Sequence, residues 1–151
     1  MSYQQLNIDR IRDKVSDIKY SLTNLRRYAG AQDEKFLTNI DAVGAARYSF
    51  IVLIEASMNI ANHLCARMLD KAPANYAETF LLLGEHGIIN SGLTEKLAQM
   101  ARFRNLLVHG YAKVDDMRML KTIRDDLKDV DEFINEIGNI VLGQGEKSDG
   151  D

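Results

Sequence analysis

Apolar residues recur at intervals of three and four along most of the chain, which is the spacing that places them on one side of an α-helix. The first stripe of this kind runs from Ile8 to Leu25, and Gly30 ends the pattern. The charged residues of this segment fall between the stripe positions, as a solvent-exposed helix face requires. We therefore predict an amphipathic helix that ends at Gly30.

A second and longer helix is predicted from about residue 33 to about residue 69. It carries two neighbouring apolar stripes, so it should be buried on a broad front and form the centre of the fold. One stripe contains Phe36, Ile40, Val43, Phe50, Ile54, Ala61, Leu64 and Met68, and the other contains Ile51, Met58 and Cys65. Arg47 falls on the first stripe, where it either reaches past the core to solvent or marks a groove in it.

Pro73 interrupts the helical pattern, and further helices are predicted after it. Asn75, with Glu78 three residues later, has the spacing of an N-cap in front of a short apolar helix. A longer helix is predicted to start near Leu93 and to end at Gly110.

The last predicted helix is capped by Asp115 or Asp116 and carries an unbroken apolar stripe from Leu120 to Val141. Residues 143–151 are polar and rich in glycine, so we predict a disordered tail there. The fold class that follows is all-α: an up-and-down bundle over residues 1–142, with four main helices and one short helix.

The composition narrows the class of protein. Hydrophobic residues make up 46% of the chain and charged residues 27%, which is typical of a soluble globular domain. The single cysteine, Cys65, excludes an internal disulfide and favours a cytoplasmic protein. The longest run of large apolar residues, 50–54, is too short to cross a membrane. With a net charge of −3, nonspecific coating of nucleic acid is not expected, so any RNA contact must be local.

Several kinds of chemistry are excluded by absent motifs. The chain has no phosphate-binding P-loop, and one cysteine cannot form a Cys-rich zinc site. A di-iron site in a helical bundle needs Glu-x-x-His, and none of His63, His86 and His109 has a glutamate at that spacing. We therefore expect neither a metal nor a nucleotide cofactor. His63 is expected to be a hydrogen-bonded histidine inside the bundle, and His86 to be exposed in a turn.

The end of the helix before Gly110 carries the candidate chemistry. Asn105 and His109 are four residues apart and share one helix face, and the long side chain of Arg104 can reach the same space. His109 lies in the last turn, where the helix dipole favours the imidazolium. An arginine that holds a phosphate, beside a histidine that moves a proton, is sufficient for RNA cleavage without metal, because the ribose 2′-hydroxyl serves as the nucleophile. Six basic residues lie between positions 101 and 124, and five besides Arg104 either guide RNA to the site or only form a solvated helix face: Arg102, Lys113, Arg118, Lys121 and Arg124.

The pattern Arg104-Asn105-x-x-x-His109-x-Tyr111 resembles the signature of HEPN domains, and in particular of their HepT-like branch. The resemblance includes the Ile54-Glu55-Ala56 segment of the predicted central helix and covers roughly residues 5–140. It implies a helical bundle that forms a homodimer, in which the motifs of two subunits meet at a shared cleft. It also implies a metal-independent ribonuclease that acts as the toxin of a toxin–antitoxin pair.

The same resemblance assigns roles to individual residues and names a partner. Arg104 and His109 would be catalytic, and Asn105 would orient the cleft. A minimal nucleotidyltransferase would be the antitoxin, which neutralises the toxin by adding AMP to Tyr111. Glu55 would support the site if it pairs with Arg104, although it could equally pair with Arg47 or face water.

Simpler interpretations stay open. Arg104 and His109 could be polar residues that only cap a helix end, and Tyr111 could only pack against the bundle. The alternative function is a non-catalytic helical dimer that binds a nucleotidyltransferase, with Tyr111 as the acceptor. A purely structural dimer is the third hypothesis.

Overall fold

The computed structural model describes residues 5–109 and 115–149. Within these ranges every regular element is helical: seven α-helices and one short π-helical segment, η1. The four long helices are α1 (Ile8–Ala29), α3 (Ile40–Leu64), α5 (Ser91–His109) and α7 (Leu127–Asp149). The short elements are α2 (Asp33–Leu37), η1 (Cys65–Leu69), α4 (Tyr76–Glu85) and α6 (Asp116–Asp125). The predicted all-α class is confirmed.

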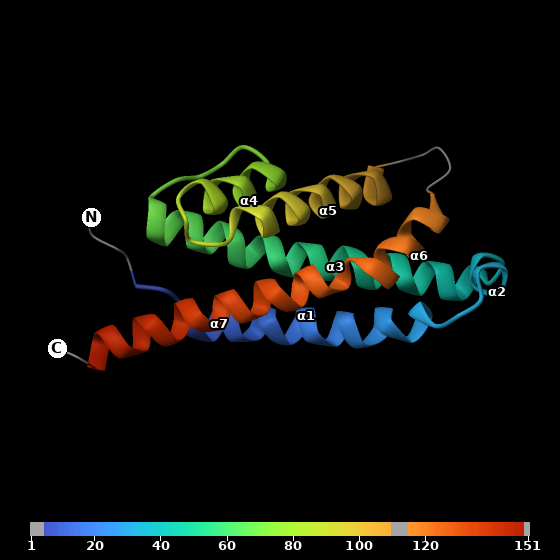
Figure 1. Cartoon of the computed structure of the whole chain (residues 1–151), viewed down its shortest axis with the longest axis horizontal. Helices are drawn as coiled ribbons and strands as arrows, with labels where there is room; N and C mark the ends of the chain where they lie inside the picture. Colours follow the sequence, from blue (N-terminus) through green and yellow to red (C-terminus); the bar gives the residue numbers. More distant parts are fainter. Residues whose placement is uncertain (1–4, 110–114, 150–151) are drawn as a thin grey trace.

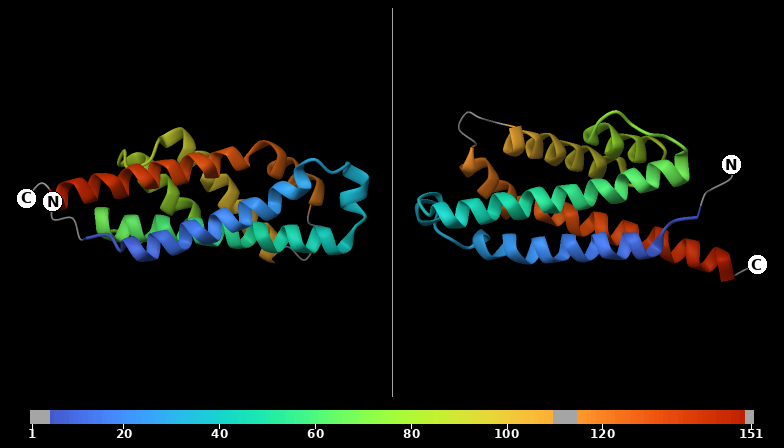
Figure 2. Two further views of the ribbon diagram at one scale, coloured as in Figure 1. Left: turned by 90° about the horizontal axis from the view of Figure 1, so that it is seen from below. Right: turned by 180° about the vertical axis from the view of Figure 1, so that it is seen from behind.

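The long helices alternate in direction, as an up-and-down bundle requires (Figure 1). α3 packs against α1, α4 and α5, whereas α7 packs against α1 and α5 (Figures 1 and 2). Two predicted helix boundaries are also confirmed. Gly30 is the C-cap of α1, and the Asn75 side chain accepts a hydrogen bond from the Glu78 backbone N–H at 2.9 Å.

The central position of α3 follows from its two apolar stripes. Phe50, Leu53 and Ile54 are completely buried, and burial of each such side chain contributes about 1.5–3 kcal/mol. With η1, the helix covers residues Ile40–Leu69, and a window of 18 residues within it has a mean hydropathy of 1.3, so by length and composition it could cross a membrane. Since 67% of that window is buried inside the bundle, the same composition is accounted for by a core helix.

The predicted helix over residues 33–69 is wrong at its beginning, because the chain breaks between α2 and α3. The Asn39 side chain accepts a hydrogen bond from the Ala42 backbone N–H at 3.1 Å and so caps α3. An N-cap residue leaves the helical conformation, and this break is hidden in a pattern of apolar spacing. As a result Ile40, which was placed on the core stripe, is 85% exposed.

The predicted last helix is also divided in two. Asp115 caps α6 by accepting a hydrogen bond from the Arg118 N–H at 3.0 Å, which settles the choice between Asp115 and Asp116. α6 ends at Asp125 with Asp126 as its C-cap, and α7 begins at Leu127. The apolar stripe runs across this break with its residues still buried: Leu120, Ile123, Leu127, Val130 and Ile137. Over residues 5–109 and 115–149 the bundle therefore has three short α-helices besides η1, rather than the one short helix predicted.

α7 continues to Asp149, beyond the point at which the sequence predicts a disordered tail. The polar, glycine-rich composition of residues 143–149 disfavours a helix that must start there. Extension of a helix that is already formed avoids the cost of nucleation, because each added residue brings its own backbone hydrogen bond.

Candidate functional site

The Arg104 side chain lies where α3, α4 and α5 meet, and only 12% of it is exposed. Its Nη2 forms an ion pair with Oε1 of Glu55 on α3. Its Nη1 donates a hydrogen bond of 3.2 Å to Oδ1 of the neighbouring Asn105. Three of the predicted site residues are thus brought together, and Glu55 pairs with Arg104 rather than with Arg47.

A fourth residue completes this cluster. The ring of Tyr76, the first residue of α4, has its centroid 5.6 Å from the guanidinium carbon of Arg104. This distance is within the range of a cation–π interaction. Tyr76 was missed by the sequence analysis, because no spacing rule connects the start of α4 with the last turns of α5.

The two bonds of Arg104 leave a defined part of its guanidinium for a ligand. A guanidinium has five N–H groups, and one on each Nη is used by Glu55 and Asn105. The Nε is buried and has no hydrogen-bond partner among the described residues. The second N–H of each Nη has no partner among the described residues, and these two groups, called here the free edge of Arg104, could bind a phosphate.

His109 is the last residue of α5, and it is exposed. Within one chain it lies five positions after Arg104, which corresponds to about 7.5 Å along the helix axis and about 140° around it. The described part of the chain shows no contact between the two side chains within one subunit. The expected convergence of the motifs of two subunits stays a prediction. Tyr111 lies outside the described residues.

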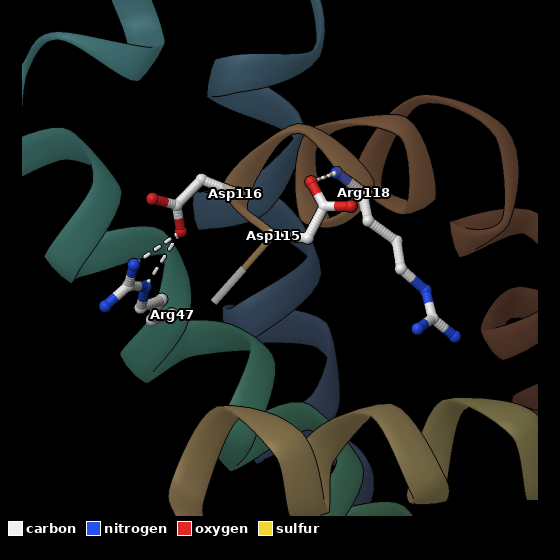
Figure 3. A network of polar contacts seen from close by, with 4 residues as sticks. All are labelled: Arg47, Asp115, Asp116 and Arg118. Carbon is white, nitrogen blue, oxygen red and sulfur yellow. Dashed lines mark hydrogen bonds and ion pairs between the residues drawn. The ribbon is translucent and has the colours of Figure 1, made fainter. Parts of the chain in front are cut away.

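Arg47 has a structural partner on α6. Its Nε and Nη2 donate to Oδ1 of Asp116 at 3.0 and 2.6 Å (Figure 3). Asp115, the N-cap of α6, directly precedes Asp116 in the chain (Figure 3). The ion pair fixes the start of α6, the helix that follows the segment with Tyr111, onto α3.

The remaining candidate residues have structural roles. His63 is buried and its Nε2 accepts a hydrogen bond of 2.9 Å from the Asn7 backbone N–H, as expected for a histidine inside the bundle. Burial, followed by the charges of Arg67 and Arg10, lowers the pKa of His63. Cys65 is a buried core residue, and burial raises the pKa of its thiol to about 11. His86 is exposed, as predicted.

The basic residues considered as RNA guides divide into two groups. Arg124 donates to the backbone oxygens of Ala29 and Ala31 and pairs with Asp33, so its role is structural. Arg102 and Lys121 are exposed, and Lys113 lies outside the described residues. The guanidinium carbon of Arg118 lies 4.7 Å from the centre of the buried Phe103 ring.

Over residues 5–109 and 115–149 no group of three His, Cys, Asp or Glu side chains is placed to hold a metal ion.

Comparison of the sequence with known proteins adds a second line of evidence. A family model described as Ribonuclease HepT-like matches residues 18–137. The mRNA nuclease HepT of Shewanella oneidensis is 24% identical over 129 residues, which cover 85% of this chain and 96% of the relative. The tRNA nuclease HepT of Aphanizomenon flos-aquae is 20% identical over 128 residues, which cover 85% of this chain and 87% of the relative.

Comparison with solved structures shows that the same fold occurs in other proteins. The structure of a tri-AMPylated Shewanella oneidensis HEPN toxin in complex with an MNT antitoxin matches with a TM-score of 0.81 at 24% identity, over 87% of this chain and 98% of the toxin. The cytosolic protein YutE of Bacillus subtilis, whose function is unknown, matches with a TM-score of 0.80 at 15% identity, over 95% of each chain. Because the family model spans most of the chain, including Glu55 and the whole Arg104–Tyr111 motif, the protein belongs to the ribonuclease HepT-like family.

Proposed function

We propose that the protein is a metal-independent endoribonuclease and the toxin of a toxin–antitoxin pair. The observation that carries this proposal is the nearly buried Arg104, held by Glu55 and Asn105, on the helix that ends with His109. A helix end with a purely structural role would not need a guanidinium that is held in place by two partners and still has N–H groups left for a ligand. We expect the protein to act in the cytoplasm, where its RNA substrates are found.

The chemistry follows from the two side chains. The edge of Arg104 would bind the non-bridging oxygens of the scissile phosphate and stabilise the negative charge of the transition state. His109 would take the proton of the ribose 2′-hydroxyl as its oxygen bonds to phosphorus. The bond from phosphorus to the 5′-oxygen breaks, and a protonated histidine supplies the proton that this oxygen needs. The products are a 2′,3′-cyclic phosphate and a free 5′-hydroxyl.

A homodimer would supply the geometry that one subunit lacks. Leu106 and Val108 are exposed apolar residues on α5, between Arg104 and His109 in the chain. Pairing of the α5 ends about a two-fold axis would cover them and bring His109 of each subunit near Arg104 of the other. Two histidines would then be present, one as base and one as acid.

The partner is proposed from the relatives. The solved HEPN toxin is AMPylated and bound to an MNT antitoxin, and two relatives are named as mRNA and tRNA nucleases. We infer that RNA is the substrate here, and that a minimal nucleotidyltransferase neutralises the protein by adding AMP to Tyr111.

Cleavage of RNA in the presence of EDTA tests the proposal. The wild-type protein should cleave RNA, and the variants Arg104→Ala and His109→Ala should each have lost this activity. The matched controls are Arg12→Ala and His86→Ala, which change an exposed arginine on α1 and an exposed histidine after α4. Equal cleavage by the wild type and both site variants would contradict the nuclease hypothesis.

The second candidate function is a non-catalytic dimer that binds the nucleotidyltransferase and accepts AMP on Tyr111. It is favoured by the exposure of His109 and its separation from Arg104 within one chain. Mass spectrometry of the protein after co-expression with the nucleotidyltransferase separates the two. AMP on Tyr111 in a protein that never cleaves RNA would support this second function.

A further inference from the structure

Tyr76 is an aromatic residue that stays at the surface beside the arginine of the site. It is 38% exposed, whereas Phe80, one turn further along α4, is completely buried. The Phe80 ring packs at 5.9 Å from Phe133 in an edge-to-face arrangement, so it anchors α4 in the core. The role of Tyr76 is therefore not explained by core packing.

The first turns of α4, the helix that begins at Tyr76, are held in place by contacts of Thr79 with α3 and η1. Thr79 Oγ1 is 3.0 Å from Oδ1 of Asn62, and the Cys65 thiol lies 3.5 Å from the Thr79 carbonyl oxygen. The Asn75 cap fixes the first turn of α4 from the other side. A ring on so rigid an element loses little conformational freedom when a ligand packs on it, which reduces the entropic cost of binding.

The position of the ring relative to Arg104 limits what it can contact. Glu55 and Asn105 occupy two N–H groups of the guanidinium, and the Tyr76 ring lies 5.6 Å from the guanidinium carbon. A phosphate bound at the remaining edge would lie next to this ring. In a nucleotide the base is one sugar away from the phosphate, so the base of a bound nucleotide is within reach of Tyr76.

We propose that Tyr76 is a substrate-positioning residue that stacks on an unpaired base next to the cleaved phosphate. This inference rests on the proposed nuclease function and specifies its substrate class. In duplex RNA the bases stack on each other and are not available to a side chain, whereas loops and single strands offer their faces to aromatic rings. The substrate is therefore single-stranded RNA or the loop of a hairpin.

The test compares a short single-stranded RNA with versions that lack the base on either side of the cleavage point. The variants are Tyr76→Leu, which removes the ring, and Tyr76→Phe, which keeps it. Tyr20→Leu, which changes an exposed tyrosine on α1, is the control. Stacking of one base predicts that Tyr76→Leu reduces kcat/KM on intact RNA by about 5- to 100-fold. On the abasic RNA that lacks the stacked base, Tyr76→Leu and the wild type should have equal kcat/KM. Tyr76→Phe should behave as the wild type on all three RNAs.

The outcomes separate this inference from the proposed function. If Tyr76→Leu slows the intact and both abasic RNAs by the same factor, the ring acts only by covering Arg104, and the inference is overturned. Binding to the same RNAs with a 2′-deoxy nucleotide at the cleavage point gives a readout without cleavage. Binding that depends on the base and is lost in Tyr76→Leu supports the inference, whether or not the wild type cleaves RNA. A wild type that binds in this way but cleaves no RNA would overturn only the nuclease proposal. Equal binding of intact and abasic RNAs by the wild type would overturn the stacking role.

Discussion

The carboxylate of Glu55 on α3 pairs with the guanidinium of Arg104 on α5, and this pair joins the central helix to the helix of the motif. The two residues are 49 positions apart in the chain. An arginine that is 12% exposed loses most of its contact with water, and a carboxylate partner compensates for that loss. The pair also fixes the direction in which the free edge of Arg104 points.

We predict that Glu55→Ala reduces RNA cleavage without unfolding the protein. The side chain of Glu55 is 48% exposed, so its removal leaves no large cavity, but Arg104 loses the contact that orients it. A misplaced phosphate-binding group should lower kcat/KM by about 10- to 100-fold. Cleavage assays together with thermal melting check this prediction.

Glu55→Gln is the conservative variant for this experiment, because its amide oxygen can still accept a hydrogen bond from Arg104 but carries no charge. It should fall between the wild type and Glu55→Ala. Glu132→Ala, at an exposed position on α7, is the control. Full activity of Glu55→Ala would show that Arg104 does not depend on this pair.

The sequence predicts the bundle and much of the site because both rest on periodic or local patterns. The stripes of α1 and α3 locate the core, and the motif Arg104-Asn105 fixes two neighbours on one helix. The pairing of Glu55 with Arg104 is expected as one of several possibilities, since a charged residue beside an apolar stripe needs a partner.

Other features depend on contacts that no spacing rule contains. The break at Asn39 arises from one side-chain hydrogen bond, and the break at Asp126 leaves the apolar stripe intact. Tyr76 reaches Arg104 only because α4 folds back along α3. His109 lies on the predicted helix end, but the described part of one chain shows no contact between it and an arginine, and the homodimer that would bring the two together is part of the proposal.

The buried His63 predicts that the protein loses stability in mildly acidic solution. Its pKa in the folded state is lowered, mainly by burial, from the ordinary histidine value of about 6.5. Below that value the unfolded chain binds a proton that the folded chain resists, so the free energy of unfolding decreases as pH falls from 6.5 toward the folded pKa. Protonation also removes the acceptor for the Asn7 N–H.

Melting temperatures of the wild type and His63→Gln between pH 7.5 and pH 5 test this dependence. Glutamine can accept the hydrogen bond and does not titrate, so the variant should lose less stability than the wild type over this range. His86→Gln, at an exposed position, should follow the wild type. Parallel curves for the wild type and His63→Gln would contradict the prediction.

The ion pair between Arg47 and Asp116 should contribute a small and measurable stability. Their side chains are 36% and 25% exposed, so the pair is partly screened by solvent, and a coupling of about 1 kcal/mol is expected. A double-mutant cycle with Arg47→Met and Asp116→Asn isolates this coupling in urea unfolding. If the two changes are strictly additive, the contact in Figure 3 does not stabilise the attachment of α6 to α3.

The close approach of α4 and α5 at Gly84 predicts that alanine at Gly84 and alanine at Gly138 have opposite effects on the free energy of unfolding. A methyl group on Gly84 would lie 2.2 Å from Thr94 Oγ1 and 3.1 Å from the Cα of Ser91, so Gly84→Ala must push the two helices apart. We expect it to lower the free energy of unfolding by about 1–3 kcal/mol. A methyl group on Gly138 of α7 meets nothing within 4 Å, and Gly138→Ala should stabilise the protein by up to about 1 kcal/mol, since alanine favours the helix.

Thr94→Ala provides the control for this steric cause. It removes the atom nearest to the added methyl group, so the destabilisation by Gly84→Ala should be smaller in the Thr94→Ala background than in the wild type. The contact with the Ser91 backbone stays, so the rescue should be partial. Urea unfolding of the four proteins measures it. Equal destabilisation in both backgrounds would show that the Thr94 hydroxyl is not the cause of the effect.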